Sequence, residues 1–243
     1  MQAENKKWYA NWFNTPYYHI LYKERDHTEA KLLMDNLVNY LNIDKDSQIL
    51  DLACGKGRHS VYLNSLGYKV TGADLSEESI KEAKKYESET LHFKVHDMRH
   101  ALPNKYDIIF NLFTSFGYFD EDEDNYQALL AIHNSLIENG LACIDFMNVD
   151  YVIENLIKNE TKHIEGIDFH IKRYTTKTHI CKEISFNDKN ETFLFTEKVR
   201  ILRLSDFEEM MQKAGIYLLD VFGDYKLQKF NIKHSPRLLM IFT

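Results

Sequence analysis

The sequence predicts an α/β fold built on a doubly wound, mostly parallel seven-stranded sheet with helices on both faces. Two observations predict this class. Short apolar runs alternate with helical patterns over residues 48–147, which is typical of parallel sheets. One more helix and two more apolar runs follow over 206–242. A chain of 243 residues with 44% hydrophobic residues is large enough for one such domain and a small addition.

The first part of the chain contains most of the expected elements. Apolar residues at helical spacing predict a helix over 29–41. Five apolar runs are expected to form strands: 48–52, 69–73, 90–95, 106–111 and 141–146. Helices are expected over 58–66, which Gly67 ends, and over 124–137. Ser76 is expected to cap another helix, which has acidic residues in its first turn.

The pattern changes after Asp150. Apolar residues tend to alternate with polar ones over 163–203, which predicts two to four antiparallel strands with a turn at 187–190. The same kinds of signal predict the remaining elements: a helix over 206–213 capped by Ser205 and ended by Gly215, strands over 216–222 and 237–242, and a turn at Asn139-Gly140.

Composition excludes several classes of function. The net charge is −7, so a nucleic-acid partner is not expected. No apolar run approaches the length of a membrane span, and the first residues lack an apolar signal core. Cys54, Cys143 and Cys181 are widely spaced, which indicates reduced thiols and no disulfide or metal site. We therefore expect a cytoplasmic monomer or homodimer without a metal.

The first motif is the segment 49–60, ILDLACGKGRHS, which is an apolar run followed by a glycine turn and a helix start. Gly55 and Gly57 allow a ligand to approach the backbone because they lack a Cβ atom. Asp51 puts a negative charge where a dinucleotide fold places its pyrophosphate, so a cationic cofactor suits the position better. Two glycines alone fit a tight turn without a ligand equally well.

The second motif is the segment 70–76, VTGADLS, an apolar run that ends in Asp74. A carboxylate about 20 residues beyond the glycine loop can accept hydrogen bonds from both ribose hydroxyls. The alternative is an acid at a helix N-terminus, just before Ser76. NAD-binding proteins use the same acid, but their pattern has a third glycine where this chain has Ser60.

With these motifs in order, the chain resembles the class I S-adenosylmethionine-dependent methyltransferases. The resemblance covers about residues 48–147 and resumes at the last helix and two strands. It implies a Rossmann-like fold with an antiparallel last strand, and S-adenosyl-L-methionine as cofactor. The loop would lie against the methionyl part and Asp74 would bind the ribose. The cofactor-binding residues that it implies here are Asp51, Ala53, Cys54, Gly55, Gly57, Asp74 and Leu75.

Two later strand ends extend the resemblance. It implies that Asp97 accepts from the adenine amino group while the backbone of Met98 contacts the ring, the alternative being an acid in a surface turn. Asn111, at the end of the run 106–111, would contact the amino-acid end of the cofactor. The residues after it lack the Pro-Pro-Tyr that marks methyltransferases acting on nucleic-acid bases.

Aromatic residues are expected near the acceptor. Phe113, Phe116 and Tyr118 would form an apolar wall, although each fits core packing equally well. The run 17–26 resembles the lid of small-molecule members of the family. The alternative for this run is an aromatic hydrophobic staple. The resemblance suggests that Tyr22 and Arg25 meet the cofactor carboxylate, and Tyr17, Tyr18 and His19 are expected to face the substrate. Asp224 and Tyr225 follow a strand and are expected to line the substrate pocket. Arg237 either lines it too or simply begins the last strand.

Three parts are expected: an aromatic, helical N-terminal lid over 1–42, an S-adenosylmethionine-binding domain over 43–150 and 204–243, and an antiparallel β insertion over 151–203 that forms a substrate cap. The expected reaction is in-line attack by a small-molecule nitrogen, oxygen or carbon on the sulfonium methyl. The protein would mainly align and desolvate the reactants.

No catalytic residue is assigned from the sequence. His19, Tyr17, Tyr18 and Asp224 are candidate bases, needed only if the nucleophile arrives protonated. The alternative functions are an RNA methyltransferase, an NAD-dependent oxidoreductase and a non-catalytic protein that binds S-adenosylmethionine.

Overall fold

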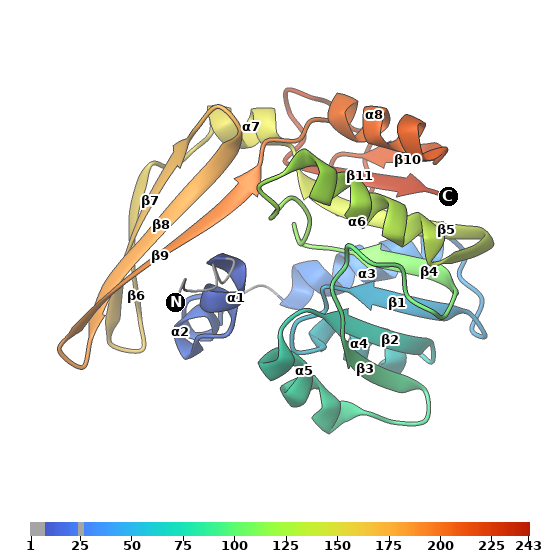
Figure 1. Cartoon of the computed structure of the whole chain (residues 1–243), viewed down its shortest axis with the longest axis horizontal. Coiled ribbons are helices and arrows are strands. Elements are labelled where there is room, and N and C mark those ends of the chain that lie inside the picture. Colours follow the sequence, from blue (N-terminus) through green and yellow to red (C-terminus); the bar gives the residue numbers. More distant parts are fainter. Residues whose placement is uncertain (1–7, 24–26) are drawn as a thin grey trace, which may run out of the picture. The chain divides into compact units, whose positions relative to one another are not determined.

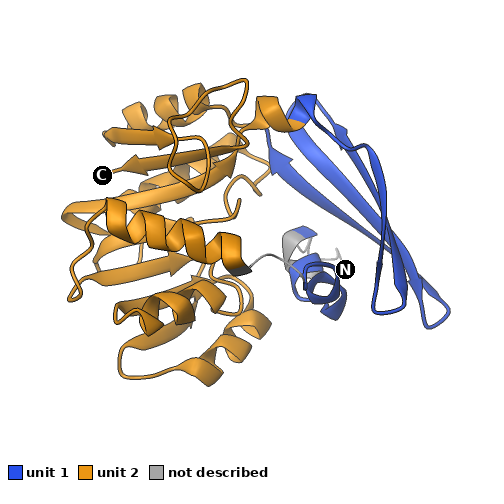
Figure 2. Ribbon diagram, turned by 180° about the vertical axis from the view of Figure 1, so that it is seen from behind, with its two compact units in different colours: residues 1–25, 153–201 blue, residues 26–152, 202–243 orange. Residues whose placement is uncertain are grey.

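A computed structural model describes residues 8–23 and 27–243 of the chain. It contains two compact units (Figure 2). Unit 1 comprises residues 1–25 and 153–201, and unit 2 comprises residues 26–152 and 202–243. The chain leaves unit 2 and enters unit 1 within the short helix α7 (Val149–Glu154). Each unit is described by itself.

A seven-stranded sheet forms the centre of unit 2 (Figure 1). Its strands are β1 (Gln48–Leu52), β2 (Lys69–Asp74), β3 (Leu91–Val95), β4 (Tyr106–Asn111), β5 (Leu136–Met147), β10 (Leu218–Phe222) and β11 (Arg237–Phe242). The strand order is β10-β11-β5-β4-β1-β2-β3. Strand β11 is antiparallel to both of its neighbours, and the other pairs are parallel. The predicted fold class is confirmed.

Helices cover both faces of this sheet (Figure 1). They are α3 (His27–Tyr40), α4 (Arg58–Ser65), α5 (Glu77–Ala83), the 3-10 turn η1 (Lys84–Tyr86), α6 (Asp122–Asn134) and α8 (Leu204–Ala214). Apolar residues of α3, α4 and α5 share one buried cluster, which includes Leu33, Leu63 and Ile80. Phe207 of α8 packs against Phe146 of β5, with ring centroids 5.5 Å apart.

Several element boundaries in unit 2 differ from the predictions by a few residues, and two of them have a clear local cause. Strand β5 begins at Leu136, because this residue, before the predicted turn, already pairs with Tyr106 of β4; Asn139 lies within the register shift that follows and has φ 61°. Helix α8 begins at Leu204, so Ser205 lies inside it. Asp206 takes the capping role, since its carboxylate accepts the Arg203 N–H at 2.7 Å.

Unit 1 combines two short helices with an antiparallel sheet. The helices are α1 (Trp8–Phe13) and α2 (Pro16–Leu21), and the strands are β6 (Asn159–Ile164), β7 (Ile167–Thr175), β8 (His179–Asp188) and β9 (Glu191–Arg200). The strands pair in chain order. Trp12 and Leu21 pack into one cluster with Phe169, Ile184 and Phe186 of the sheet. The antiparallel strands and the predicted turn before residue 191 are confirmed.

Among residues 8–23 and 27–243, no helix is both long enough and apolar enough to cross a bilayer. The same described residues contain no group of three or more His, Cys, Asp or Glu side chains arranged to hold a metal ion.

Candidate functional site

The glycine loop leaves the carboxyl end of β1 and turns sharply. Ala53, Gly55 and Gly57 all have positive φ, at 63°, 56° and 78°. The N–H groups of Ala53 and Cys54 donate to the carbonyl of Ala73 at 2.7 and 3.1 Å, which ties the loop to the end of β2. The left-handed backbone at positions 55 and 57 explains why glycine is used there.

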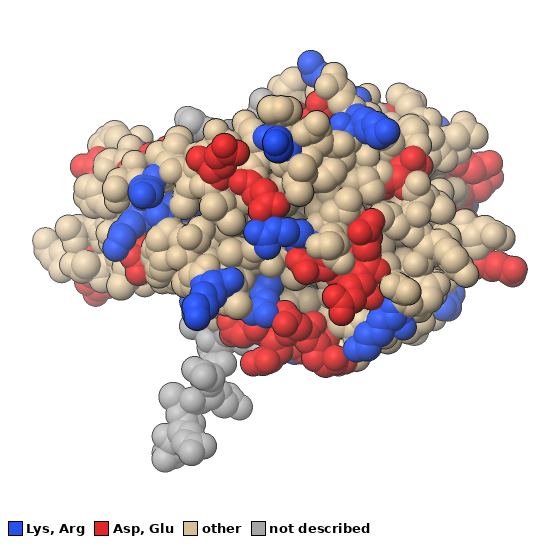
Figure 3. Space-filling model, turned by 90° about the horizontal axis from the view of Figure 1, so that it is seen from above, with Lys and Arg blue, Asp and Glu red and all other residues tan. Residues whose placement is uncertain are grey.

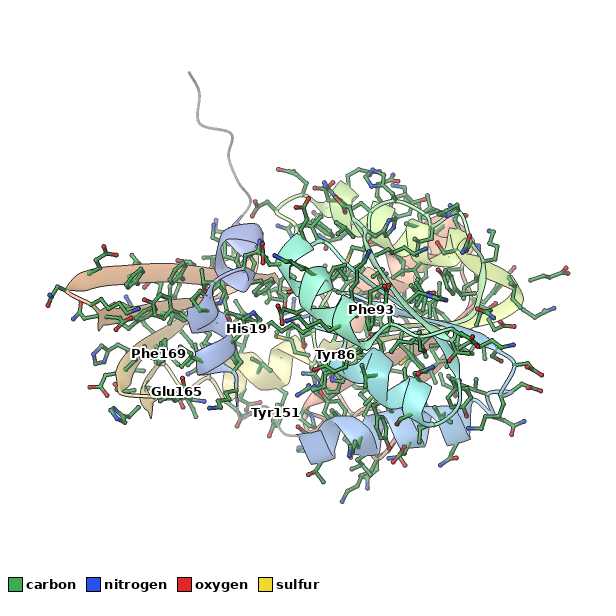
Figure 4. All side chains as sticks on the ribbon, turned by 90° about the horizontal axis from the view of Figure 1, so that it is seen from below. His19, Tyr86, Phe93, Tyr151, Glu165 and Phe169 are labelled. Carbon is green, nitrogen blue, oxygen red and sulfur yellow. The ribbon has the colours of Figure 1, made fainter. Side chains whose placement is uncertain are left out.

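The two glycines have different roles. A Cβ atom on Gly57 would lie 2.5 Å from the ring of Phe93, the β3 residue labelled in Figure 4. Gly72 of β2 has the same neighbour at 2.5 Å. By contrast, a Cβ atom on Gly55 would meet nothing within 4 Å. Gly57 is therefore needed for internal packing, whereas Gly55 leaves open space above the backbone for a ligand.

Asp51 lies buried under this loop, with 2% exposure. The hydroxyl of Ser60 donates to its carboxylate at 2.6 Å. Burial raises the pKa of Asp51 to about 6, the charge of Asp74 adds to this rise, and the Ser60 bond and Arg58 oppose it. Ionising a buried carboxylate costs free energy, and a nearby cation reduces that cost. A cationic ligand would therefore favour the ionised form of Asp51.

Asp74 ends β2 and binds two backbone segments. Its Oδ2 accepts the N–H of Gly55 and its Oδ1 accepts the N–H of Ser76, both at 2.8 Å. Burial raises the pKa of Asp74, and these hydrogen bonds oppose the rise. Ser76 itself caps α5 through its side chain, as predicted. A carboxylate has about four acceptor positions, so Asp74 keeps capacity for ribose hydroxyls. Leu75 beside it is exposed.

Asp97, after β3, is held in an ion pair. The Arg99 guanidinium contacts it at 2.5 Å and reaches Asp124 at 3.0 Å. Burial works to raise the pKa of Asp97, but the hydrogen bonds and charge of Arg99 outweigh it and lower that pKa. Met98 is half-buried next to it. An adenine amino group would therefore share the carboxylate of Asp97 with Arg99.

Asn111 is buried at the carboxyl end of β4, with 1% exposure. Its amide nitrogen donates to the carbonyl of Leu52, at the end of β1, at 3.0 Å. Its Oδ1 has no hydrogen-bond partner within the described part of the chain. An unsatisfied buried oxygen costs about 1–3 kcal/mol. A donor such as the ammonium group of S-adenosylmethionine fits this oxygen chemically.

A second polar cluster centres on Asp145, which the sequence analysis did not single out. Asp145 of β5 is fully buried and faces four donors: the Phe113 N–H at 2.8 Å, the Tyr225 hydroxyl at 3.2 Å, and Nε and Nη2 of Arg237 at 2.8 and 2.6 Å. Burial disfavours the Arg237 charge, but the charge of Asp145 raises the Arg237 pKa. The sequence does contain one sign of such a role, because Asp145 is an acidic residue within the apolar run 141–146 that is expected to form a strand.

This cluster fixes the loop after β4. Phe113 and Thr114 are both left-handed, with φ 60° and 57°, although neither is glycine. Nη2 of Arg237 donates to the Thr114 hydroxyl at 2.8 Å. The Phe113 ring lies 4.5 Å from the His59 ring and 5.6 Å from the Tyr225 ring. Three segments of unit 2 thus meet around one aromatic residue at the carboxyl edge of the sheet.

The other predicted acceptor residues of unit 2 differ in accessibility. Phe116 is fully buried against Phe207 of α8, so its ring packs the core. Tyr118 is half-buried and donates its hydroxyl to the carbonyl of Thr114 at 2.6 Å. Asp224 accepts the N–H groups of Lys226 and Gln228, which shapes its own turn.

The aromatic residues predicted for the lid belong to unit 1. Tyr17 donates to Asp188 at 2.7 Å, and Tyr22 donates to Glu197 at 2.6 Å. His19, labelled in Figure 4, meets the edge of the Tyr18 ring at 5.3 Å. The contact of Tyr22 with a cofactor carboxylate stays a prediction, and Arg25 lies outside the described residues.

A family model described as a methyltransferase domain matches residues 43–219. The chain belongs to this family. A curated relative, the glycine/sarcosine N-methyltransferase of Halorhodospira halochloris, is 25% identical over 210 residues, which cover 82% of this chain and 76% of the relative.

Two solved structures share the fold. An S-adenosylmethionine-dependent methyltransferase from Clostridium acetobutylicum ATCC 824 aligns with a TM-score of 0.78 and 21% identity, over 96% of this chain and 98% of that one. CalS10, a SAM-bound amino pentose methyltransferase from Micromonospora echinaspora, aligns with a TM-score of 0.71 and 17% identity, over 94% and 97%. This chain is an S-adenosylmethionine-dependent methyltransferase, which sets aside the oxidoreductase alternative.

Proposed function

We propose that this methyltransferase acts on a small molecule and that the carboxyl ends of β1, β2 and β4 bind its cofactor. One observation supports the cofactor assignment most: open backbone at Gly55, the Asp74 carboxylate and the unsatisfied oxygen of Asn111 all belong to adjacent strand ends. In parallel sheets, ligands bind where the strand order reverses, at the carboxyl edge.

Each group has a defined task in this proposal. Gly55 lets the methionyl part approach the backbone, Asp74 accepts from the ribose, and Asn111 accepts from the cofactor ammonium. Asp97 and Met98 contact the adenine. When bound, S-adenosylmethionine supplies a methyl group already activated on a sulfonium, so these residues mainly orient the reactants and exclude water. No base is assigned.

The charge of the chain supports a small acceptor over a nucleic acid. The net charge is −7, and on the face shown in Figure 3 the Lys and Arg side chains are interspersed with Asp and Glu. A nucleic-acid enzyme needs a contiguous basic surface. The printed name of the Halorhodospira halochloris relative gives glycine and sarcosine as its substrates, so nitrogen acceptors are the first to test. The buried, unpaired thiols of all three cysteines support a cytoplasmic location.

Calorimetry with S-adenosylmethionine and S-adenosylhomocysteine tests the cofactor site. Asp74→Asn should weaken both by about 10- to 100-fold, because charge-assisted hydrogen bonds contribute about 1.5–3 kcal/mol. Asp44→Asn is the matched control, since Asp44 also accepts a backbone N–H, from Asp46, but in an exposed turn. Equal affinity in Asp74→Asn and wild type would refute the assignment.

Transfer from labelled S-adenosylmethionine to a panel of small amines, alcohols and carbon acids tests the acceptor class. We expect label in one of these classes and none in tRNA or rRNA. Salt-sensitive binding and labelling of RNA would overturn the proposal. Tight cofactor binding without any transfer would favour a non-catalytic role.

A further inference from the structure

Arg237 uses only one edge of its guanidinium inside unit 2. Its Nε and Nη2 atoms contact Asp145, and Nη2 also donates to Thr114. Nη1 makes no hydrogen bond within residues 8–23 and 27–243, and it is not among their buried unpaired atoms. The Arg237 side chain is 20% exposed, whereas Asp145 is fully buried. Nη1 therefore keeps N–H donors that the described residues leave unused.

The direction of this free edge is fixed. The Asp145 carboxylate also accepts from the Phe113 backbone and the Tyr225 hydroxyl, so it is held from several sides. The Tyr225 ring lies 5.4 Å from the guanidinium carbon of Arg237. A donor that is already oriented loses little freedom when it binds a ligand.

The surroundings suit one chemical class. The rings of Phe113, Tyr225 and His59 lie next to one another. Asp145 cancels part of the Arg237 charge, and Glu29 of α3 is a second acid that acts on it. A single guanidinium whose charge is partly neutralised, beside aromatic rings, fits a small ligand that carries one negative charge. Guanidinium groups pair best with planar oxyanions such as carboxylates.

The position of Arg237 separates it from the ribose and adenine residues. The sheet order places β5 and β4 between β11, which Arg237 begins, and β1, which precedes the glycine loop. At about 4.8 Å per strand, β11 lies roughly 14 Å from β1. The ribose and adenine residues lie on β2 and after β3, still farther away. A group bound at Arg237 is thus not the nucleoside part of the cofactor.

We propose that Nη1 of Arg237 binds a carboxylate of the methyl acceptor, so that the substrate is a small carboxylate-bearing molecule. This inference rests on the proposed function, because it places the acceptor at the carboxyl edge of the same sheet. Asp145 is the positioning residue that orients Arg237.

The test measures carboxylate binding to protein saturated with S-adenosylhomocysteine, by ligand-observed NMR. The probes are two matched pairs, acetate against acetamide and glycine against glycinamide. Arg237→Lys keeps the charge that pairs with Asp145 but loses the planar second edge. Arg203→Lys is the matched control, since Arg203 pairs with Asp150 at 2.9 Å elsewhere in unit 2.

Wild type and Arg203→Lys should bind at least one carboxylate about 10- to 100-fold more tightly than its amide. Arg237→Lys should lose that preference while its affinity for S-adenosylhomocysteine stays within about twofold. If Arg237→Lys does not fold, the pair Asp145→Asn with Arg237→Gln removes both charges together and should give the same result. Cofactor affinity is measured first, so failure of the cofactor site is distinguished from failure at Arg237.

Two results would overturn the inference. The first is that wild type shows no preference for the carboxylate over the amide, or shows the same preference as Arg237→Lys. The other is a loss in Arg237→Lys that appears with S-adenosylhomocysteine but not with 5′-methylthioadenosine, which lacks the amino-acid tail. That second pattern would assign Arg237 to the cofactor carboxylate.

Discussion

Asp51 links the electrostatics of the glycine loop to the charge of the cofactor. Its carboxylate is buried, and its pKa is raised to about 6. A sulfonium stabilises the ionised form, whereas the neutral thioether of S-adenosylhomocysteine does not. Affinity for S-adenosylmethionine should therefore increase as pH rises through about 6, relative to affinity for S-adenosylhomocysteine.

We expect the ratio of the two affinities to grow about three- to tenfold between about pH 5 and about pH 8, as measured by calorimetry. Asp74, whose pKa burial also raises, is assigned to the ribose, which both ligands share, so its protonation should affect the two affinities alike. Asp51→Asn separates the two residues and should remove most of the change. A ratio that is independent of pH in wild type would contradict this account.

Replacing Gly55 should mainly weaken cofactor binding, whereas replacing Gly57 should mainly lower stability. Gly55→Ala adds a methyl group that meets no protein atom within 4 Å, so its stability cost should be limited to the strain of a left-handed alanine, about 1 kcal/mol, while cofactor affinity falls at least about tenfold. Gly57→Ala drives a Cβ into Phe93 and should cost about 1–3 kcal/mol of stability. Thermal melts and calorimetry on both variants measure the contrast. Equal cofactor affinity in Gly55→Ala and wild type would remove the loop from the site.

The candidate site could be proposed from the sequence where the signal is local. The glycine loop and Asp74 follow directly from the segments that contain them. Asp145 could not be found this way, because its donors come from residues 113, 225 and 237, which only the fold brings together. Phe116 shows the converse limit, since an apolar residue in a loop sequence can equally belong to the core.

At the level of elements, strands β1 and β4 match their predicted bounds because each is a short apolar run with clear ends. The start of β5 was mispredicted, since pairing with β4 extends the strand past Asn139-Gly140. The start of α8 was mispredicted. Ser205 is a common N-cap residue, which placed the predicted start at 206, but the helix begins at Leu204. The Asp206 carboxylate accepts the Arg203 N–H from within the first turn.

The β8–β9 hairpin should accept a stabilising change. Its two-residue turn consists of Lys189 and Asn190, with φ 49° and 64°, a geometry in which glycine is preferred. Asn190→Gly relieves the left-handed backbone but increases the entropy of the unfolded chain, so it should raise the free energy of unfolding by less than about 1 kcal/mol, and Asn190→Val should lower it. Denaturant midpoints measure both. The two variants moving in the same direction would contradict the turn geometry.

At the level of the whole molecule, the sequence predicted a sheet-based domain with an antiparallel addition, and the structure divides into two compact units. The sequence placed residues 1–42 together as a lid, whereas α3 groups with unit 2. The buried residues Leu33, Met34 and Leu37 explain this, because they belong to the core cluster of the large sheet. The cap role of 151–203 stays a prediction.

Cofactor binding should stabilise the two units unequally, because the proposed cofactor residues that the structure groups at strand ends are in unit 2. At about 100 times its dissociation constant, S-adenosylhomocysteine should stabilise unit 2 by about 2.7 kcal/mol. Hydrogen exchange should slow around 53–57 and 74–76 and stay unchanged in strands β6–β9. Equal slowing in both units would show that they unfold as one.

Phe93 constrains how this enzyme can change over time. One ring limits the size of residues on two other segments, Gly57 in the loop and Gly72 in β2. A larger side chain at either glycine requires a smaller residue at 93, and in addition it must accommodate the left-handed backbone at Gly57 or the Cys54 sulfur next to Gly72. Substitutions in the cofactor loop and in β3 are therefore expected to appear as coordinated sets among descendants of this sequence, and directed evolution of the loop should start from variants at position 93.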